Sequence, residues 1–272
     1  MADSIVITGA SGFLGQALMR HLRTSGFLVT GFSRQRVPGL MTIANYADMP
    51  IFENAILIHL AQDSNASGSF GEKDIDLCKS LIDMPWKHVV YVSSAVVYGD
   101  AKEYLRQPNE EVFSFSDYSR VKIACEKIVS EVGGTSLRIS NLYGPGMNTD
   151  TAINVIVRQI PGKAPLELMT IFPIRDFLWI EDAVSCLINA CNIRPSGILN
   201  VGTGKGIAIG DLAKLALNIA GESYRPVVGK VGFDRISCLI LDISKTKSLL
   251  NWSPVTDISD GLFNLLKEKL HE

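Results

Sequence analysis

Short apolar runs recur along the chain and are separated by longer segments of mixed polarity. The runs are continuous and mostly β-branched, which is the pattern of strands buried on both faces of a sheet. Leu14, Leu18 and Leu22 fall at helical spacing before Gly26, a typical stop, and predict a helix between the first two runs. This alternation predicts an α/β fold with a doubly wound parallel sheet. The expected strands are Ser4–Thr8, Phe27–Phe32, Ala55–Leu60, His88–Val92, Thr135–Ile139 and Ile198–Val201.

The residue pattern changes after residue 146, where turn residues become more frequent and clear strand patterns become fewer. We therefore expect two parts that are interlaced along the chain. Residues 1–146 and 176–202 would form a Rossmann domain, and residues 147–175 and 203–272 would form a smaller C-terminal lobe.

A glycine-rich loop follows the first expected strand, with Gly9, Gly12 and Gly15 spaced three apart. Ligands of parallel sheets bind beyond the carboxyl ends of the strands. Glycine there lets a pyrophosphate approach the backbone, and a helix starting near Gly12 would offer it free N–H groups and a positive dipole end. A plain tight turn would give the same spacing, but the position at the first strand-to-helix junction favours a dinucleotide site.

The end of the second expected strand distinguishes between cofactors. An acidic residue there binds the ribose of NAD, whereas an arginine accommodates the phosphate of NADP. The chain has Ser33 and Arg34 at this point, with Arg36 as a second contact and no acid. NADP(H) is therefore favoured over NAD(H), and a solvated basic loop is the alternative.

Tyr118 and Lys122 stand four apart and would share one face of a helix. A neighbouring ammonium favours the phenolate, so we expect Lys122 to lower the pKa of Tyr118 and make it a general acid/base. Ser94 ends an apolar strand at the same edge of the sheet as the glycine loop. Its hydroxyl could hold the carbonyl oxygen that the tyrosine protonates.

Composition narrows the range of partners. The 272 residues are 47% hydrophobic and 20% charged, and the net charge of −2 offers no basic surplus for nucleic acid or a membrane surface. No apolar stretch approaches the ~20 residues that span a bilayer, and we expect no signal peptide. The five scattered cysteines are typical of reduced thiols and favour a cytoplasmic location, and the four histidines lack the spacing of metal ligands.

Together and in this order, these elements resemble the extended short-chain dehydrogenase/reductase family, and within it the NAD(P)-dependent nucleotide-sugar epimerase/dehydratase/reductase branch. The resemblance covers nearly the whole chain. Its motifs are T-G-x-x-G-F-L-G at Thr8–Gly15, H-L-A at His59–Ala61, S-S-A-V-V-Y-G at Ser93–Gly99, Y-x-x-x-K at Tyr118–Lys122, L-R-I-S-N-L-Y-G-P-G at Leu137–Gly146, R-D-F-L-W-I-E-D at Arg175–Asp182, N-V-G at Asn200–Gly202, D-I-S-K at Asp242–Lys245 and N-W-S-P at Asn251–Pro254.

The resemblance implies a role for each matching residue. Tyr118 would be the general acid/base, Lys122 would bind the nicotinamide ribose, and Ser94 would be the catalytic hydroxyl. In the substrate-binding lobe and its border, Asn141, Arg175 and Arg235 would contact the substrate, although Arg175 could instead brace the two lobes. His59 is expected to be a packed strand residue. The implied cofactor contacts are Gly9, Ser11, Gly12, Phe13, Leu14, Gly15, Ser33, Arg34, Ala61, Tyr118 and Lys122.

The chain departs from the family pattern in its substrate region. Residues 166–174 lack the F-G-x-G that often precedes the arginine-aspartate pair. Gly232 stands where an arginine often clamps the substrate phosphate, with Lys230 or Arg235 as loose substitutes. Ala95 and Val96 stand where dehydratases carry an acidic pair, which disfavours a 4,6-dehydratase.

The leading hypothesis is an NADPH-dependent reductase of a nucleotide-activated keto sugar of the 4-keto-6-deoxy type. The missing acid after the second strand motivates it, because an exchangeable NADPH suits net reduction. A nucleotide-sugar epimerase would use the same three residues with a retained NAD(H). A non-catalytic nucleotide-binding sensor or scaffold is the alternative from another class. By analogy with the family, the substrate would be a nucleotide sugar for polysaccharide biosynthesis and the protein a homodimer.

Overall fold

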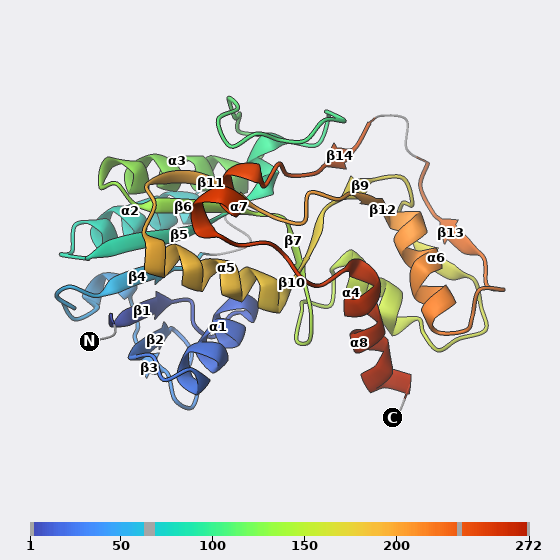
Figure 1. Cartoon of the computed structure of the whole chain (residues 1–272), viewed down its shortest axis with the longest axis horizontal. Coiled ribbons are helices and arrows are strands. Elements are labelled where there is room, and N and C mark those ends of the chain that lie inside the picture. Colours follow the sequence, from blue (N-terminus) through green and yellow to red (C-terminus); the bar gives the residue numbers. More distant parts are fainter. Residues whose placement is uncertain (1–2, 63–68, 233–235, 271–272) are drawn as a thin grey trace.

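The computed structural model of the chain describes residues 3–62, 69–232 and 236–270, with the backbone alone for 69, 70 and 268–270 (Figure 1). Its centre is a seven-stranded sheet in the order β11-β6-β5-β4-β1-β2-β3. Every pair in this sheet is parallel. The strands are β1 (Ile5–Thr8), β2 (Val29–Ser33), β3 (Met41–Thr42), β4 (Ile56–His59), β5 (His88–Ser94), β6 (Thr135–Ile139) and β11 (Gly197–Val201).

The doubly wound parallel sheet expected from the sequence is confirmed, and each expected strand is present with nearly the expected bounds. Strand β3 was not expected. Both of its residues are exposed, so no hydrophobic pattern marks it.

Alternating side chains of the strands bury the two faces of the sheet under different helices. Ile5 and Ile7 of β1 share a core with α1 (Phe13–Thr24) and α5 (Ile180–Ile193). Val6 points the other way and shares a core with α2 (Ser69–Ile82) and α3 (Asp117–Glu131). The period-2 alternation of a strand therefore produces the three-layer arrangement.

The second part of the molecule is built from short elements around a separate apolar core. Figure 1 shows α4, α6 and α8 gathered at the end of the molecule away from the large sheet. Its strands form three small sheets, β10-β7, β12-β9-β14 and β13-β8. The elements of this part are α4 (Ala152–Arg158), α6 (Ile209–Ile219), α8 (Ile258–Leu270), β7 (Asn141–Tyr143), β8 (Leu166–Leu168), β9 (Ile174–Arg175), β10 (Phe177–Trp179), β12 (Ile207–Ala208), β13 (Val227–Gly229) and β14 (Cys238–Leu239). Three further short helices of the molecule are η1 (Tyr46–Asp48), η2 (Ala95–Tyr98) and α7 (Ser244–Leu250).

One segment assigned by sequence to the small lobe packs on the large sheet. Leu250 and Trp252, at and after the end of α7, belong to the core formed with α1 and α5. The Trp252 indole donates to Ser185 Oγ at 2.8 Å. The division into two lobes therefore stays a proposal, with the region of α7 shifted to the Rossmann side.

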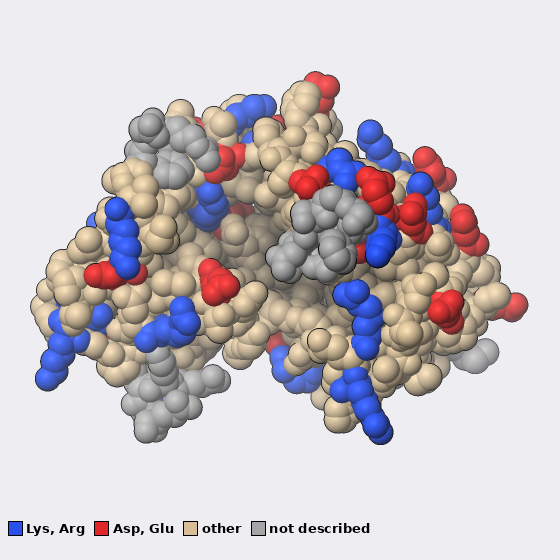
Figure 2. All heavy atoms as spheres, turned by 180° about the vertical axis from the view of Figure 1, so that it is seen from behind, with Lys and Arg blue, Asp and Glu red and all other residues tan. Residues whose placement is uncertain are grey.

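The face opposite that of Figure 1 is hollowed between the two halves of the molecule, and charges of both signs flank the hollow (Figure 2). Within the described residues, no helix is both long enough and apolar enough to cross a membrane. The same residues contain no group of three or more potential metal ligands.

We predict that His59 makes the fold acid-sensitive. It is a packed strand residue, as expected, with 3% exposure and its Nδ1 atom 2.7 Å from Thr8 Oγ1. Burial lowers its pKa from 6.5 to about 3. Below pH 6.5 the unfolded chain therefore binds a proton that the folded chain does not, and stability falls by up to about 1.4 kcal/mol per pH unit.

His59→Asn, which keeps a polar partner for Thr8, should flatten the decline of the unfolding free energy between about pH 6 and about pH 4. Urea titrations at several pH values measure this slope. The exposed His21 supplies the control, because His21→Asn should keep the wild-type slope. An equally steep decline in His59→Asn would contradict the prediction.

Candidate active site

The loop between β1 and α1 packs its backbone against the end of β4. Gly9 has a φ of +70°, and a Cβ added there would lie 2.7 Å from the Ala61 nitrogen. A Cβ at Gly15 would lie 2.8 Å from the Ala10 Cα. Packing therefore requires both glycines. Gly12 differs, because a Cβ there would come no closer than 3.3 Å, to the Gly9 oxygen.

Two cavities meet at this loop and share Gly9, Gly12, Leu60 and Gln62. The inner cavity, of about 350 Å³, reaches α3, and the outer cavity, of about 310 Å³, reaches the end of β2. The structure thus brings together the residues that the sequence assigns to the cofactor, although their contacts with it stay a prediction. Those lining the two cavities are Gly9, Ser11, Gly12, Phe13, Leu14, Gly15, Ser33, Arg34, Ala61, Tyr118 and Lys122.

Helix α1 begins where the two cavities meet. Gly12 is its N-cap residue, and no side chain caps this end. The first N–H groups of the helix and its positive dipole end are therefore available to an anion. Such a helix start can hold a pyrophosphate.

The outer cavity has a basic side chain and no carboxylate among its described lining residues. Arg34 is exposed at its rim. Ser33 is fully buried, its hydroxyl donates to Ser11 Oγ at 2.9 Å, and it accepts from the Gln35 N–H at 3.0 Å. Ser33 therefore orients Ser11, while Arg34 is the group free to reach an anion from this side.

Ser94, Tyr118 and Lys122 line the inner cavity together. Ser94 ends β5, and helix α3 carries the other two side chains on one face behind a capping box at Ser116. The Tyr118 hydroxyl is hydrogen-bonded to Ser94. Lys122 Nζ donates to the Val92 carbonyl at 2.7 Å and lies 5.5 Å from the centre of the Tyr118 ring. This arrangement can hold an oxygen atom and move a proton to or from it.

The pKa of Tyr118 shifts in the direction opposite to the sequence expectation. Burial raises it, and the hydrogen bond with Ser94 opposes that rise. Lys122 is also buried, which lowers its own pKa from 10.5 to about 8. Tyr118 is therefore a protonated phenol at neutral pH in the ligand-free chain.

A buried carboxylate fixes α3 against the end of β5. Glu126, one turn beyond Lys122, accepts from Ser93 Oγ at 2.5 Å and pairs with Arg138 of β6 at 2.7 Å. The side chains of this ion pair are only 4% and 2% exposed. Breaking such a pair would leave a buried charge unpaired, which costs free energy. The ion pair therefore holds β6 and α3 in one register.

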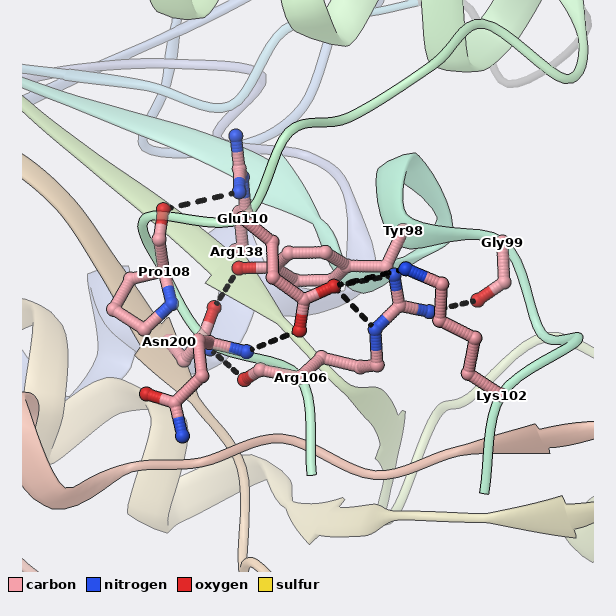
Figure 3. Close-up of polar contacts among 9 residues, drawn as sticks. Tyr98, Gly99, Lys102, Arg106, Pro108, Glu110, Arg138 and Asn200 are labelled. Atoms are coloured by element: carbon pink, nitrogen blue, oxygen red, sulfur yellow. Dashed lines mark hydrogen bonds and ion pairs between the residues drawn. The ribbon is translucent and has the colours of Figure 1, made fainter. Parts of the chain in front are cut away.

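Tyr98, four residues after Ser94, is clamped between two guanidinium groups (Figure 3). The guanidinium carbons of Arg138 and Arg106 lie 4.7 and 4.9 Å from its ring centre. Its hydroxyl donates to Asn200 Oδ1 at 2.7 Å. These contacts anchor η2, and with it the residues that follow Ser94, to β6 and β11.

A larger cavity of about 780 Å³ adjoins the inner one and shares Ser94, Ile139 and Ser140 with it. Two predicted substrate residues, Asn141 and Arg175, line this large cavity. Both also line a cavity of about 350 Å³ in the small lobe, whose other walls are mostly apolar. The predicted residue Arg235 lies outside the described residues.

Arg175 is held in place by a residue of the small lobe and by a residue of the segment that follows η2. Its guanidinium donates to Asp100 Oδ2 at 2.9 Å and to Ser237 Oγ at 2.8 Å. The adjacent Asp176 is fully buried and accepts from the backbone and side chain of Thr203, at 2.9 and 2.7 Å. Asp176 thus braces the junction, and Arg175 remains at the border of two cavities.

Sequence reasoning missed three polar residues of the site. Gln62 and Ser140 line the inner cavity, and their polar side-chain atoms are buried without hydrogen-bond partners among the described residues. Gln62 directly follows the quoted H-L-A motif and Ser140 lies within the quoted motif Leu137–Gly146, but neither was given a role. Tyr46 lines the outer cavity and accepts from the Gly9 N–H at 3.1 Å, and it comes from a segment with no recognisable motif.

Comparison with known proteins agrees with this geometry. The sequence profile described as "NAD dependent epimerase/dehydratase family" matches residues 5–202. The dTDP-4-dehydro-6-deoxyglucose reductase of Escherichia coli is 25% identical over 97% of this chain and 97% of its own length. A putative UDP-glucose 4-epimerase of Methanocaldococcus jannaschii is 24% identical over 95% of both chains.

Among solved structures, MoeE5 in complex with UDP-glucuronic acid and NAD is similar to this chain. It superposes with a TM-score of 0.83 at 24% identity, over 98% of this chain and 99% of MoeE5. At that identity the likeness concerns the fold.

We predict that alanine substitutions distinguish a ligand-binding glycine of the loop, Gly12, from a structural one, Gly15. Gly12→Ala should keep the melting temperature within about 2 °C of wild type, because its methyl group would make one close contact, at 3.3 Å to the Gly9 oxygen. It should weaken dinucleotide binding, because the methyl group would stand at the helix start. Gly15→Ala should lower both, because its methyl group meets the loop backbone. Thermal unfolding and NADPH titration measure the two effects. Equal thermal losses in both variants would contradict the assignment.

Proposed function

The chain belongs to the NAD dependent epimerase/dehydratase family, and we propose that it is an NADPH-dependent reductase of a nucleotide-activated 4-keto-6-deoxy sugar. Membership makes it an NAD(P)-dependent oxidoreductase or epimerase of the extended short-chain dehydrogenase/reductase type. One observation carries the finer proposal. The described residues of the outer cavity present Arg34 and no carboxylate, which suits the phosphate of NADPH. An exchangeable NADPH suits net reduction.

The residues present fit a dinucleotide. The uncapped start of α1 can hold the pyrophosphate, and the two cavities on either side can hold the two nucleosides. Gly12 leaves the backbone open at the meeting point. When bound, the dihydronicotinamide supplies a hydride.

Tyr118 would deliver the proton to the oxygen of the sugar carbonyl. Its raised pKa keeps the phenol protonated at neutral pH, which suits a general acid. Ser94, hydrogen-bonded to Tyr118, would hold that oxygen in place. Lys122 would bind the ribose and orient the cofactor beside Tyr118.

The substrate would span two cavities. The sugar would occupy the large cavity, which adjoins the inner cavity at Ser94. The base would occupy the mostly apolar cavity of the small lobe. The diphosphate would then lie beside Asn141 and Arg175, which border both. A role in polysaccharide biosynthesis and a homodimeric state also belong to this proposal.

A nucleotide-sugar epimerase is the second candidate. Relatives with reductase and epimerase names match this chain over nearly equal lengths, 97% and 95%. An epimerase would use the same three residues to oxidise and then re-reduce the sugar. NAD that co-purifies tightly with the protein, without a preference for NADPH, would favour this candidate.

Tyr118→Phe should reduce turnover of a dTDP-4-keto-6-deoxy sugar by about 10²–10⁴-fold, because the phenol proton is lost. The dissociation constant for NADPH should change by less than about threefold, because the ring is kept. Steady-state rates and fluorescence titration of NADPH give the two values. Full activity in Tyr118→Phe would contradict the acid role.

Arg34→Ala should raise the dissociation constant for NADPH by about tenfold to hundredfold, because a charge-assisted hydrogen bond to the phosphate is lost. The constant for NADH should be unchanged. Arg20→Ala, on an exposed arginine of α1, is the control and should alter neither. A wild-type protein that binds NADH and NADPH equally would overturn the NADPH assignment.

A further inference from the structure

The amide of Gln62 is buried without a partner. Neither its Nε2 nor its Oε1 atom makes a hydrogen bond within the part of the chain that the structure describes, although both atoms are buried. Buried polar groups of this kind are uncommon, because each costs the free energy of desolvation. Gln62 lies just beyond β4, at the carboxyl edge of the sheet, and lines both cavities. The described residues therefore leave this amide without a partner at the border of two cavities.

The position of Gln62 identifies which part of a dinucleotide would meet it. The inner and outer cavities share Gly9, Gly12, Leu60 and Gln62, so these residues border the passage between them. A dinucleotide is two nucleosides joined by a pyrophosphate. When the nucleosides occupy the two cavities, the pyrophosphate lies in the passage.

The two basic side chains of the groove do not border the passage between the cavities. Arg34 lines the outer cavity alone and Lys122 the inner cavity alone. Among the described residues that line both cavities, Gln62 is the one whose side chain can donate a hydrogen bond. The other donors at the passage are backbone N–H groups of the loop and of the start of α1.

We propose that Gln62 binds the pyrophosphate of the dinucleotide. Its amide N–H donates to a phosphate oxygen, and its amide oxygen accepts from an adjacent ribose hydroxyl. The proposal rests on the proposed function in one respect, that the groove holds a dinucleotide. It implies that Gln62 weakens the ligand-free fold and strengthens the complex, because the unpaired amide gains its partners on binding.

Gln62→Met tests this, because methionine has similar length and no hydrogen-bonding amide. The dissociation constants of NADPH and NADH should rise by about tenfold to hundredfold. The affinity for ADP, which carries two phosphates, should fall by a similar factor when it is measured by displacement of NADPH. Adenosine, which carries none, should bind Gln62→Met and wild type alike. The melting temperature of the ligand-free variant should rise by about 3 °C.

Thr170→Val is the matched control. Thr170 Oγ1 is also buried without a partner, but Thr170 does not line either cavity of the groove. This variant should gain thermal stability and keep the wild-type affinities for NADPH and ADP. Gln62→Glu, which places a carboxylate at the passage, should lower the affinity for ADP more than Gln62→Met does.

The outcomes separate the two proposals. Unchanged ADP and NADPH affinities in Gln62→Met would overturn the role of Gln62 and leave the proposed function standing. Loss of adenosine binding together with a lower melting temperature would make Gln62 a structural residue and also overturn it. A wild-type protein that binds neither NADPH nor NADH would overturn the proposed function, and the role of Gln62 with it.

Discussion

The carboxylate of Glu126 is the group on which the geometry of the site depends. It accepts from Ser93 at the end of β5 and pairs with Arg138 of β6, while its own helix carries Tyr118 and Lys122. A buried ion pair contributes little net stability compared with apolar packing, yet breaking one costs about 3–5 kcal/mol. Strand and helix therefore cannot slide past each other without leaving a buried charge unpaired. The ion pair therefore fixes the position of α3 relative to β5 and β6, and so keeps the hydroxyls of the site within hydrogen-bonding reach of each other.

The polar groups that hold the frame of the site have hydrogen-bond partners, whereas two polar side chains beside the groove do not. In the frame, Asp176 accepts from Thr203 and from neighbouring backbone N–H groups, and the hydroxyl of Tyr98 is paired with Asn200. In the groove, Gln62 and Ser140 keep buried polar atoms without partners. Among the described residues, Tyr91 and Thr170 also keep a buried polar atom without a partner, and neither lines the groove. An unpaired group therefore indicates a ligand only where it borders a cavity, as Gln62 and Ser140 do. The frame holds the site, and the groove completes its hydrogen bonds on binding.

The sequence predicted what depends on short periodic patterns. The strands, the start of α1 and the shared face of Tyr118 and Lys122 follow from local spacing, and the structure has them. Strand β3 escaped because two exposed residues carry no pattern. The pKa direction of Tyr118 was wrong, because spacing gives the neighbour but not its burial. Gln62 escaped for the same reason, since an amide beside a motif becomes informative only when its burial and lack of partners are known.

Reduction and epimerisation begin with opposite demands on Tyr118. A reductase needs the phenol to give a proton to a carbonyl oxygen, whereas an epimerase first needs it to take one from a hydroxyl. Burial raises the pKa of Tyr118 and so keeps the proton on the phenol at neutral pH. Arg34, at the other end of the groove, favours the cofactor of net reduction. These two features are separate in sequence and in physical origin, and both favour the reductive direction.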